Sequence, residues 1–473
     1  FLVAYKLANV LRRLFAEGAF SASFLPVFSR VLVQEGKDKA QAFASQLLTV
    51  IVLVLSLFAL LVIGQYRGVV RLLAPGFSPE GEIFSMTVSL GRICFPYLIT
   101  TSVMALFCGI LNTFDRFALP AATQILFNVF FIVTLIIGII GGFPTSTVVY
   151  MLAVSTLIAG LVQVGLVWNA AERLKVAVRF VRPCFSPEVR EVGRKMVPGI
   201  LGAGVWQINL LIDTQACSFL HSGTVSYLYF ADRINQLPLS VLGIALSTVL
   251  LPTLSKLIQG GRFHQAITEF NQGMSFASFL AIPATVFIIT VPHFLVTMVY
   301  ERGNFLPHQV APVAAALRAF GCGLPAYIGA KIFAAAFFAR GDTKTPVHVG
   351  VISVLANIAF ILLLTPLLAH VGIALATALS SWINAGVLFW FLRRKSPLSI
   401  TPKTCNCCLK QLLAAGIMGA GLILVRSLGE ETFLMGSPGI RLSLLLLLVV
   451  GGFGLYGLLT YLFKAFPSTK MRS

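Results

Sequence analysis

The chain has 473 residues, of which 58% are hydrophobic and only 11% are charged, and its mean hydropathy is +0.92. Soluble domains carry about 25% charged residues, so the composition excludes an ordinary soluble protein and indicates a helical integral membrane protein. The net charge of +19 is compatible with a nucleic-acid partner, but the positions of the basic residues argue against that class.

The first 30 residues, FLVAYKLANVLRRLFAEGAFSASFLPVFSR, are long enough to cross a bilayer but carry charges within the apolar run. A charge at membrane depth costs about 2.5 kcal/mol or more, so such residues usually face a water-filled cavity. On a helix, most of the polar residues here fall close to one face. We predict that they form a wet, mainly basic wall; the alternative is a short amphipathic helix on the membrane surface. The residues are Lys6, Asn9, Arg12, Arg13 and Glu17.

A helical span needs about 20 apolar residues, and this measure predicts thirteen spans. They are 1–30, 42–65, 84–112, 118–140, 147–171, 193–220, 224–256, 271–300, 309–338, 345–368, 371–392, 409–428 and 440–463. Because the chain begins within an apolar run and without Met, we expect one further helix ahead of it and fourteen in the intact protein.

The loop charges agree with this partition. If the first span runs from outside to inside, most loop Lys and Arg lie inside. The outer loops contain only Arg67, Arg71, Arg302, Arg426 and Arg441. This bias is what the positive-inside rule predicts. Topology therefore explains the basic excess, and no nucleic-acid partner is expected.

Basic side chains also outnumber acidic ones within the spans, which favours an anionic ligand such as a phosphate or diphosphate. The alternative is that these charges pair with one another and hold helices together. Near span ends, at Arg92 and Arg318, snorkelling is expected. The basic residues are Lys6, Arg12, Arg13, Arg92, Arg233, Arg318 and Lys331, and the acids are Glu17, Asp213 and Asp232.

An internal repeat divides the chain. FLPVFSR (24–30) recurs as LLPTLSK (250–256), and LNTFDRFALP is echoed by FFARGDTKTP. Two parallel halves around a cavity are a known way to build alternating access. The predicted fold is an all-α integral membrane protein with two pseudo-symmetric six-helix lobes around a central cationic cavity, plus two extra C-terminal helices. Its predicted parts are an N-terminal lobe (1–172), a basic cytoplasmic linker (173–192), a C-terminal lobe (193–395) and a helix pair with a basic tail (396–473).

These motifs carry a resemblance to a known family. KLANVLRRLFAEGAFSASFLPVFS (6–29), ILNTFDRFALPA (110–121) and SYLYFADRINQLPLSVLGIALSTVLLPTLS (226–255) are similar to motifs of the MviN/MurJ family. Its members are lipid II flippases of the multidrug/oligosaccharidyl-lipid/polysaccharide exporter superfamily. The chain departs from the family pattern in lacking the first helix, in having Ala8 in place of Pro, and in having Gln236 where relatives often carry an acid.

The resemblance implies a flippase of the bacterial cytoplasmic membrane that moves lipid II, an undecaprenyl-diphosphate-linked peptidoglycan precursor, from the inner to the outer leaflet. It implies lipid II, membrane lipids and cell-wall synthesis proteins as partners and no cofactor, with the polyprenyl tail in a groove along the last two helices. It assigns the diphosphate to Arg12 and Arg233. The implied neighbours are Lys6, Asn9, Arg13, Glu17, Ser226 and Asp232.

Other functions stay open from the sequence. A flippase for another polyprenyl-diphosphate-linked oligosaccharide, or a non-transporting relative, would share these features. A drug/cation antiporter would need acidic cavity groups. A membrane enzyme acting on the same lipid would need clustered acids or a His/Asp set, and the His residues here are dispersed. Cys405, Cys407 and Cys408 lack a second ligand pair, so we expect no metal site there.

No GxxxxGK[ST] motif is present, which leaves an ion gradient or the membrane potential as the energy source. Asp213, Asn357 and Thr377 offer oxygen ligands for a sodium ion or, through Asp213, a proton. The alternative, which we favour, is that Asp213 only forms hydrogen bonds within the bundle, since Ile361 supplies no second carboxylate. We therefore expect transport to depend on the membrane potential.

Overall fold

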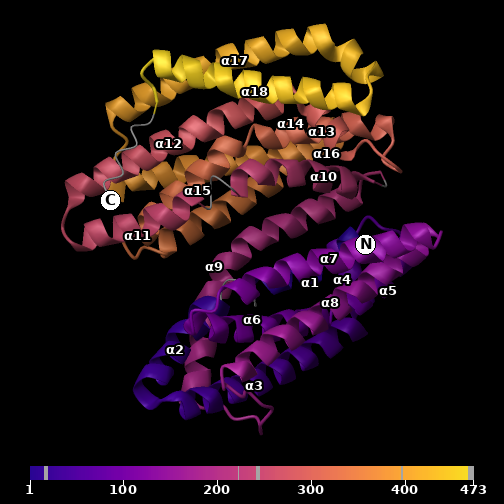
Figure 1. The fold of residues 1–473 in the computed structure, drawn as a ribbon, viewed down its shortest axis with the longest axis vertical. Coiled ribbons are helices and arrows are strands. Elements are labelled where there is room, and N and C mark those ends of the chain that lie inside the picture. The colour runs from indigo at the N-terminus through magenta and orange to yellow at the C-terminus, as the bar shows by residue number, and fades with distance from the viewer. Residues whose placement is uncertain (15–19, 222, 241–244, 396–397, 467–473) are drawn as a thin grey trace. The chain divides into compact units, whose positions relative to one another are not determined.

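The computed structural model describes residues 1–14, 20–221, 223–240, 245–395 and 398–466. Within these residues every regular element is a helix, which confirms the predicted all-α class. The chain divides into two compact units, Phe1–Phe219 (unit 1) and Leu220–Ser473 (unit 2), whose helices are labelled in Figure 1.

The main core of unit 1 lies between α2, α3 and α6, where Phe24, Phe28 and Phe107 are fully buried. The long apolar stretch of α3 starts after Gly36, whose φ of 87° suits glycine and ends the preceding helix. The described helices of unit 1 are α1 (Leu2–Arg12), α2 (Phe20–Glu35), α3 (Lys37–Gly64), α4 (Tyr66–Leu73), α5 (Glu82–Cys94), α6 (Tyr97–Thr113), α7 (Ala118–Ile140), α8 (Thr145–Arg173) and α9 (Pro187–Ser218).

Unit 2 begins with α10. Its longest helix, α16, is two helices in succession, because the backbone leaves the helical region at Ala369 (φ 49°, ψ −127°). The described elements are α10 (Thr224–Pro238), α11 (Ala245–Gln259), α12 (Phe263–Thr290), α13 (Pro292–Tyr300), the short 3-10 helix η3 (Pro307–Gln309), α14 (Val310–Gly321), α15 (Leu324–Phe338), α16 (Lys344–Lys395), α17 (Pro402–Met435) and α18 (Pro438–Leu462).

The two units share an order of elements. A helix with an internal proline (Pro26 in α2, Pro252 in α11) precedes a long span, a short helix, and a span built of two helices. The described parts of α1 and α10 both run into a π-helical turn, at 13–14 and at 239–240, a feature common at functional sites. The repeat predicted from FLPVFSR is thus present in the helix order; two pseudo-symmetric lobes around a cavity stay a prediction.

The repeat extends to a pair of arginines. Arg92 Nε donates to the carbonyl of Ile63 (3.2 Å) at the end of α3, and Arg318 Nε donates to the carbonyl of Ile289 (3.1 Å) at the end of α12. The last carbonyls of a helix lack intrahelical donors and carry partial negative charge. Arg92 and Arg318, for which snorkelling was expected, therefore each cap the C-terminal end of a long apolar helix in their own unit.

Among the described residues, nine helical stretches are long and apolar enough to cross a membrane. One of them, Lys344–Arg394, contains both predicted spans 345–368 and 371–392. The predicted span 271–300 is divided, because α12 ends at Thr290 and Pro292 starts α13. The predicted spans 1–30, 193–220 and 224–256 are not among the nine. These are the segments that carry most of the candidate site, and the count of thirteen stays a prediction.

Helix α9 belongs to unit 1, although the sequence assigned it to the C-terminal lobe. At its C-terminal end, which the loop charges predict to be the outer end, Gly76 N donates to Ser218 Oγ (3.0 Å), and Gln215 Nε2 donates to the carbonyl of Leu72 (2.6 Å). A Cβ on Gly76 would lie 2.2 Å from the carbonyl oxygen of Ser218, so only glycine permits this approach. At its N-terminal end, the predicted inner end, Glu191 pairs with Arg30 of α2. The functional lobe boundary stays a prediction.

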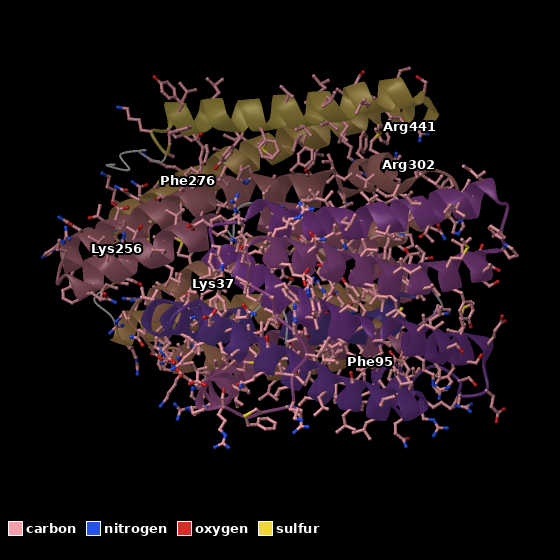
Figure 2. The ribbon with its side chains drawn as sticks, turned by 60° about the horizontal axis from the view of Figure 1, so that its bottom comes forward. Lys37, Phe95, Lys256, Phe276, Arg302 and Arg441 are labelled. Carbon is pink, nitrogen blue, oxygen red and sulfur yellow. The ribbon has the colours of Figure 1, made fainter. Side chains whose placement is uncertain are left out.

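The C-terminal pair packs on unit 2. Helices α17 and α18 lie side by side along α12 (Figure 1), and Phe294 stacks on Phe433 with ring centroids 3.9 Å apart. The Arg441 guanidinium lies 3.2 Å from the carboxylate of Glu301 and donates through Nε to the carbonyl of Phe433. Figure 2 labels Arg441 beside Arg302 at this end of unit 2.

Candidate functional site

The first basic cluster lies on α1. Val3, Ala4, Ala8 and Val10 are buried, while the polar residues of the helix occupy the opposite, half-buried face. Arg12 donates through Nε and Nη2 to Oδ1 of Asn9, at 3.1 and 3.0 Å. The amide of Asn9, one turn earlier, therefore fixes the direction of the guanidinium. Lys6 and Arg13 lie on the same helix face, and Glu17 lies outside the described residues.

Lys6 of α1 and Asp213 of α9 both belong to unit 1. Both lie near enough to Cys217 of α9 to contribute to the electrostatic field at its sulfur, and each is engaged in an interaction within the protein. A structural role for Asp213 within unit 1 stays a prediction.

The second basic cluster lies on α10. Leu228, Ala231 and Ile234 are buried, whereas Tyr229 and Arg233 are exposed on the other side. Arg233 Nη2 donates to the hydroxyl of Tyr229 (2.8 Å), and the guanidinium centre lies 4.8 Å from the centre of the Tyr229 ring. Among the described residues, no carboxylate forms an ion pair with Arg233.

Ser226 lies on the half-buried flank of α10, one turn before Tyr229. Gln236 donates through Nε2 to Oδ2 of Asp232. The side chain of Asp232 is thus directed along its own helix toward Gln236. Sequence reasoning missed Tyr229; the only available signal was its spacing of four residues from Arg233.

The residues considered for ion coupling fall into both units. Asn357 is fully buried in α16, and Ser380 Oγ donates to its Oδ1 at a long 3.5 Å and to the carbonyl of Thr377 at 3.0 Å. Asn357 and Thr377 are therefore linked through one serine, while Asp213 belongs to unit 1. In the part of the chain that the structure describes, no three His, Cys, Asp or Glu side chains gather as a metal ligand set.

The comparisons with known proteins decide the family. The family model described as lipid II flippase MurJ matches residues 1–443. This chain belongs to the MurJ family. A probable lipid II flippase MurJ from Rhizobium meliloti is 38% identical over 82% of this chain and 73% of its own length, and one from Rickettsia prowazekii is 34% identical over 98% and 90%. The family predicted from the sequence motifs is confirmed, and the protein is a multi-pass protein of the bacterial inner membrane.

The fold agrees with this membership. A structure of lipid II flippase MurJ in an inward closed conformation superposes with a TM-score of 0.80 at 23% identity, covering 98% of this chain and 91% of that one. An inward-facing multidrug resistance MATE transporter superposes with a TM-score of 0.71 at 14% identity, covering 83% and 89%. The MurJ family and the MATE transporters therefore share one helical architecture with this chain.

Proposed function

We propose that this protein moves lipid II from the inner to the outer leaflet by alternating access, with Arg12 and Arg233 binding the diphosphate. Membership of the MurJ family supports the cargo, and the polar faces of α1 and α10 support the site. Lys6, Asn9, Arg13, Ser226 and Asp232 are the proposed neighbours of the diphosphate. Partners among the cell-wall synthesis proteins are proposed on the family resemblance alone.

The proposal rests mainly on the surroundings of the Arg233 guanidinium. Its guanidinium is exposed, oriented by Tyr229, and in no ion pair with a described carboxylate. A planar guanidinium donates two parallel hydrogen bonds to phosphate oxygens, and this geometry selects a diphosphate over a simple cation or a neutral lipid. An intramembrane arginine in this state suits a ligand that brings its own negative charge.

The test is complementation in cells depleted of their native flippase. Arg12→Ala and Arg233→Ala are each expected to abolish growth while the protein still inserts into the membrane at normal levels. Arg→Lys at either position is expected to restore growth only partly, because the paired hydrogen bonds are lost. Arg318→Ala is the matched control, since this arginine caps a helix end. Normal growth of both alanine variants would overturn the site.

We further propose that the membrane potential drives transport. Moving one charge across the membrane is worth about 2.3 kcal/mol per 100 mV. A structural role for the Asp213 carboxylate is supported by its place in unit 1, where it and the cationic Lys6 both act on the electrostatic field at Cys217. Asp213→Asn should therefore impair flipping only mildly in vesicles whose potential and sodium gradient are set separately. Flipping that follows the sodium gradient at zero potential, and is lost in Asp213→Asn, would contradict this.

A further inference from the structure

The exposed face of α10 carries an aromatic residue that the diphosphate assignment does not use. Tyr229 lies one turn before Arg233, accepts a hydrogen bond from Arg233 Nη2 at 2.8 Å, and places its ring 4.8 Å from the guanidinium centre. A hydrogen bond and a cation–π contact from the same side chain restrict both the direction and the rotation of the guanidinium.

Tyr229 is itself held in place. Its ring meets that of Phe230 edge-on, at 6.1 Å between centroids. Phe230 packs against Tyr300, at 4.8 Å, and against Phe305, at 5.6 Å, and the Tyr300 hydroxyl donates to the Phe230 carbonyl at 3.2 Å. The loop that follows α13 thus supports the part of α10 that presents Tyr229.

A free arginine side chain loses rotamer entropy when it binds an anion. A side chain that is already restrained loses less on binding, which is the general advantage of preorganisation. The Tyr229 hydroxyl occupies one of the five N–H donors of the guanidinium. The remaining donors are enough for a bidentate contact with phosphate oxygens.

We propose that Tyr229 is a positioning residue that holds Arg233 in the conformation in which it binds the lipid diphosphate. This inference rests on the proposed function of Arg233. It assigns to unit 2 a counterpart of the Asn9–Arg12 pair of unit 1, with an aromatic hydroxyl in place of an amide.

The test measures binding of undecaprenyl diphosphate to the full chain in lipid nanodiscs. Tyr229→Phe keeps the ring and removes the hydrogen bond, and we expect it to weaken binding about three- to tenfold. Tyr229→Leu removes both contacts and is expected to weaken binding further. Tyr227→Phe is the matched control: Tyr227 lies on the same helix, but its ring faces His370 at 5.8 Å, so binding should be unchanged.

A double substitution separates positioning from a general structural effect. In an Arg233→Ala background, Tyr229→Phe should change the remaining affinity less than twofold, because there is no guanidinium left to orient. An undiminished loss in that background, or wild-type affinity in Tyr229→Phe alone, would overturn the inference and leave the assignment of Arg233 intact. If Arg233→Ala itself bound the lipid like wild type, the proposed site would fail as well.

Discussion

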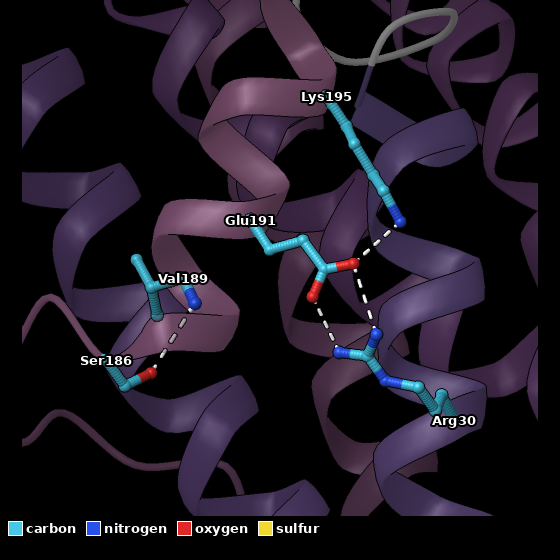
Figure 3. A network of polar contacts seen from close by, with 5 residues as sticks. All are labelled: Arg30, Ser186, Val189, Glu191 and Lys195. Atoms are coloured by element: carbon cyan, nitrogen blue, oxygen red, sulfur yellow. Dashed lines mark hydrogen bonds and ion pairs between the residues drawn. The ribbon is translucent and has the colours of Figure 1, made fainter.

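Arg30 and Lys256 are equivalent positions of the repeat, because they end the motifs FLPVFSR and LLPTLSK. The two side chains differ in their ion-pair partners. In unit 1, Arg30 donates to both carboxylate oxygens of Glu191, at 3.2 and 2.6 Å, and Lys195 lies 2.8 Å from the same carboxylate (Figure 3). In unit 2, no described carboxylate pairs with Lys256. Among the described residues of unit 2, an ion pair joins Arg441 to Glu301 at the opposite end, which the loop charges predict to be the outer one.

This difference shows that equivalent positions of the repeat are held by different helices in the two units. Glu191 is supplied by α9, which precedes α10 in the chain, and Arg441 is supplied by α18, which follows the repeated series. The capping arginines Arg92 and Arg318, which lie within the repeat, make equivalent bonds in both units. The repeat therefore determines the helix path, whereas α9 and α18 supply one partner each of the ion pairs that differ between the two units.

The largest loss of stability is expected when the ion pair between Arg441 and Glu301 in unit 2 is removed. Arg441→Ala leaves the largely buried carboxylate of Glu301 unpaired and removes the hydrogen bond to the Phe433 carbonyl. We expect a loss of about 2 kcal/mol in the free energy of unfolding. Thermal unfolding of the purified protein in detergent measures it.

Arg302→Ala is the matched control at the same end of the unit. Arg302 is exposed, and the one hydrogen bond described for its side chain goes to the carbonyl of Val299, three residues earlier. Its loss should change the free energy of unfolding by less than about 0.5 kcal/mol. Equal effects of the two substitutions would show that the Glu301–Arg441 pair does not fasten α18 to unit 2.

A smaller loss of stability, similar in the two units, is expected when either capping arginine is replaced. Arg92→Ala and Arg318→Ala each remove one charge-assisted bond to a terminal helix carbonyl. Each should lower the free energy of unfolding by about 1 kcal/mol. The comparison of the two units predicts nearly equal values. A value for one that is more than twice the other would show that the repeat does not extend to these contacts.

Much of this fold was predictable from hydropathy and charge. Long apolar runs predicted the spans, and the proline motifs predicted the recurring order of helices. The spacing of three residues placed Asn9 beside Arg12 on a helix, and the hydrogen bonds from Arg12 Nε and Nη2 to Asn9 Oδ1 agree with it. These features depend on local periodicity, which a sequence displays directly.

The contacts between distant segments were not predictable. A tyrosine in an apolar helix usually packs in the core, so Tyr229 stood out only after folding left it exposed beside Arg233. The approach of the segment after α4 to the end of α9 depends on Gly76, whose lack of a side chain leaves room for the backbone of Ser218. One sequence does not show which of its glycines is needed for a close approach.

The smallest loss of stability is expected when the ion pair between Arg30 and Glu191 in unit 1 is removed. This loss depends on pH. The hydrogen bonds from Arg30, together with that from Lys195, lower the pKa of Glu191 from its usual value of 4.5 to about 2. A carboxyl group whose pKa is lower in the folded state contributes stability above its unfolded pKa and loses it as the pH falls. Because the pair is near the surface, its contribution should be no more than about 1 kcal/mol.

Glu191→Gln isolates this contribution. Wild type should exceed the variant in the free energy of unfolding by a constant amount between pH 7 and pH 5, and the difference should shrink as the pH falls from about 4.5 toward 2, since the wild-type carboxylate is then protonated. Lys39→Gln is a suitable control, because it removes an exposed pair with Glu35 within a single inner segment. A difference that stayed constant down to pH 2 would mean that the charge of Glu191 does not hold α9 to α2. In that case the inner end of unit 1 would be held without the charge of Glu191, as the inner end of unit 2 is held at Lys256, with which no described carboxylate pairs.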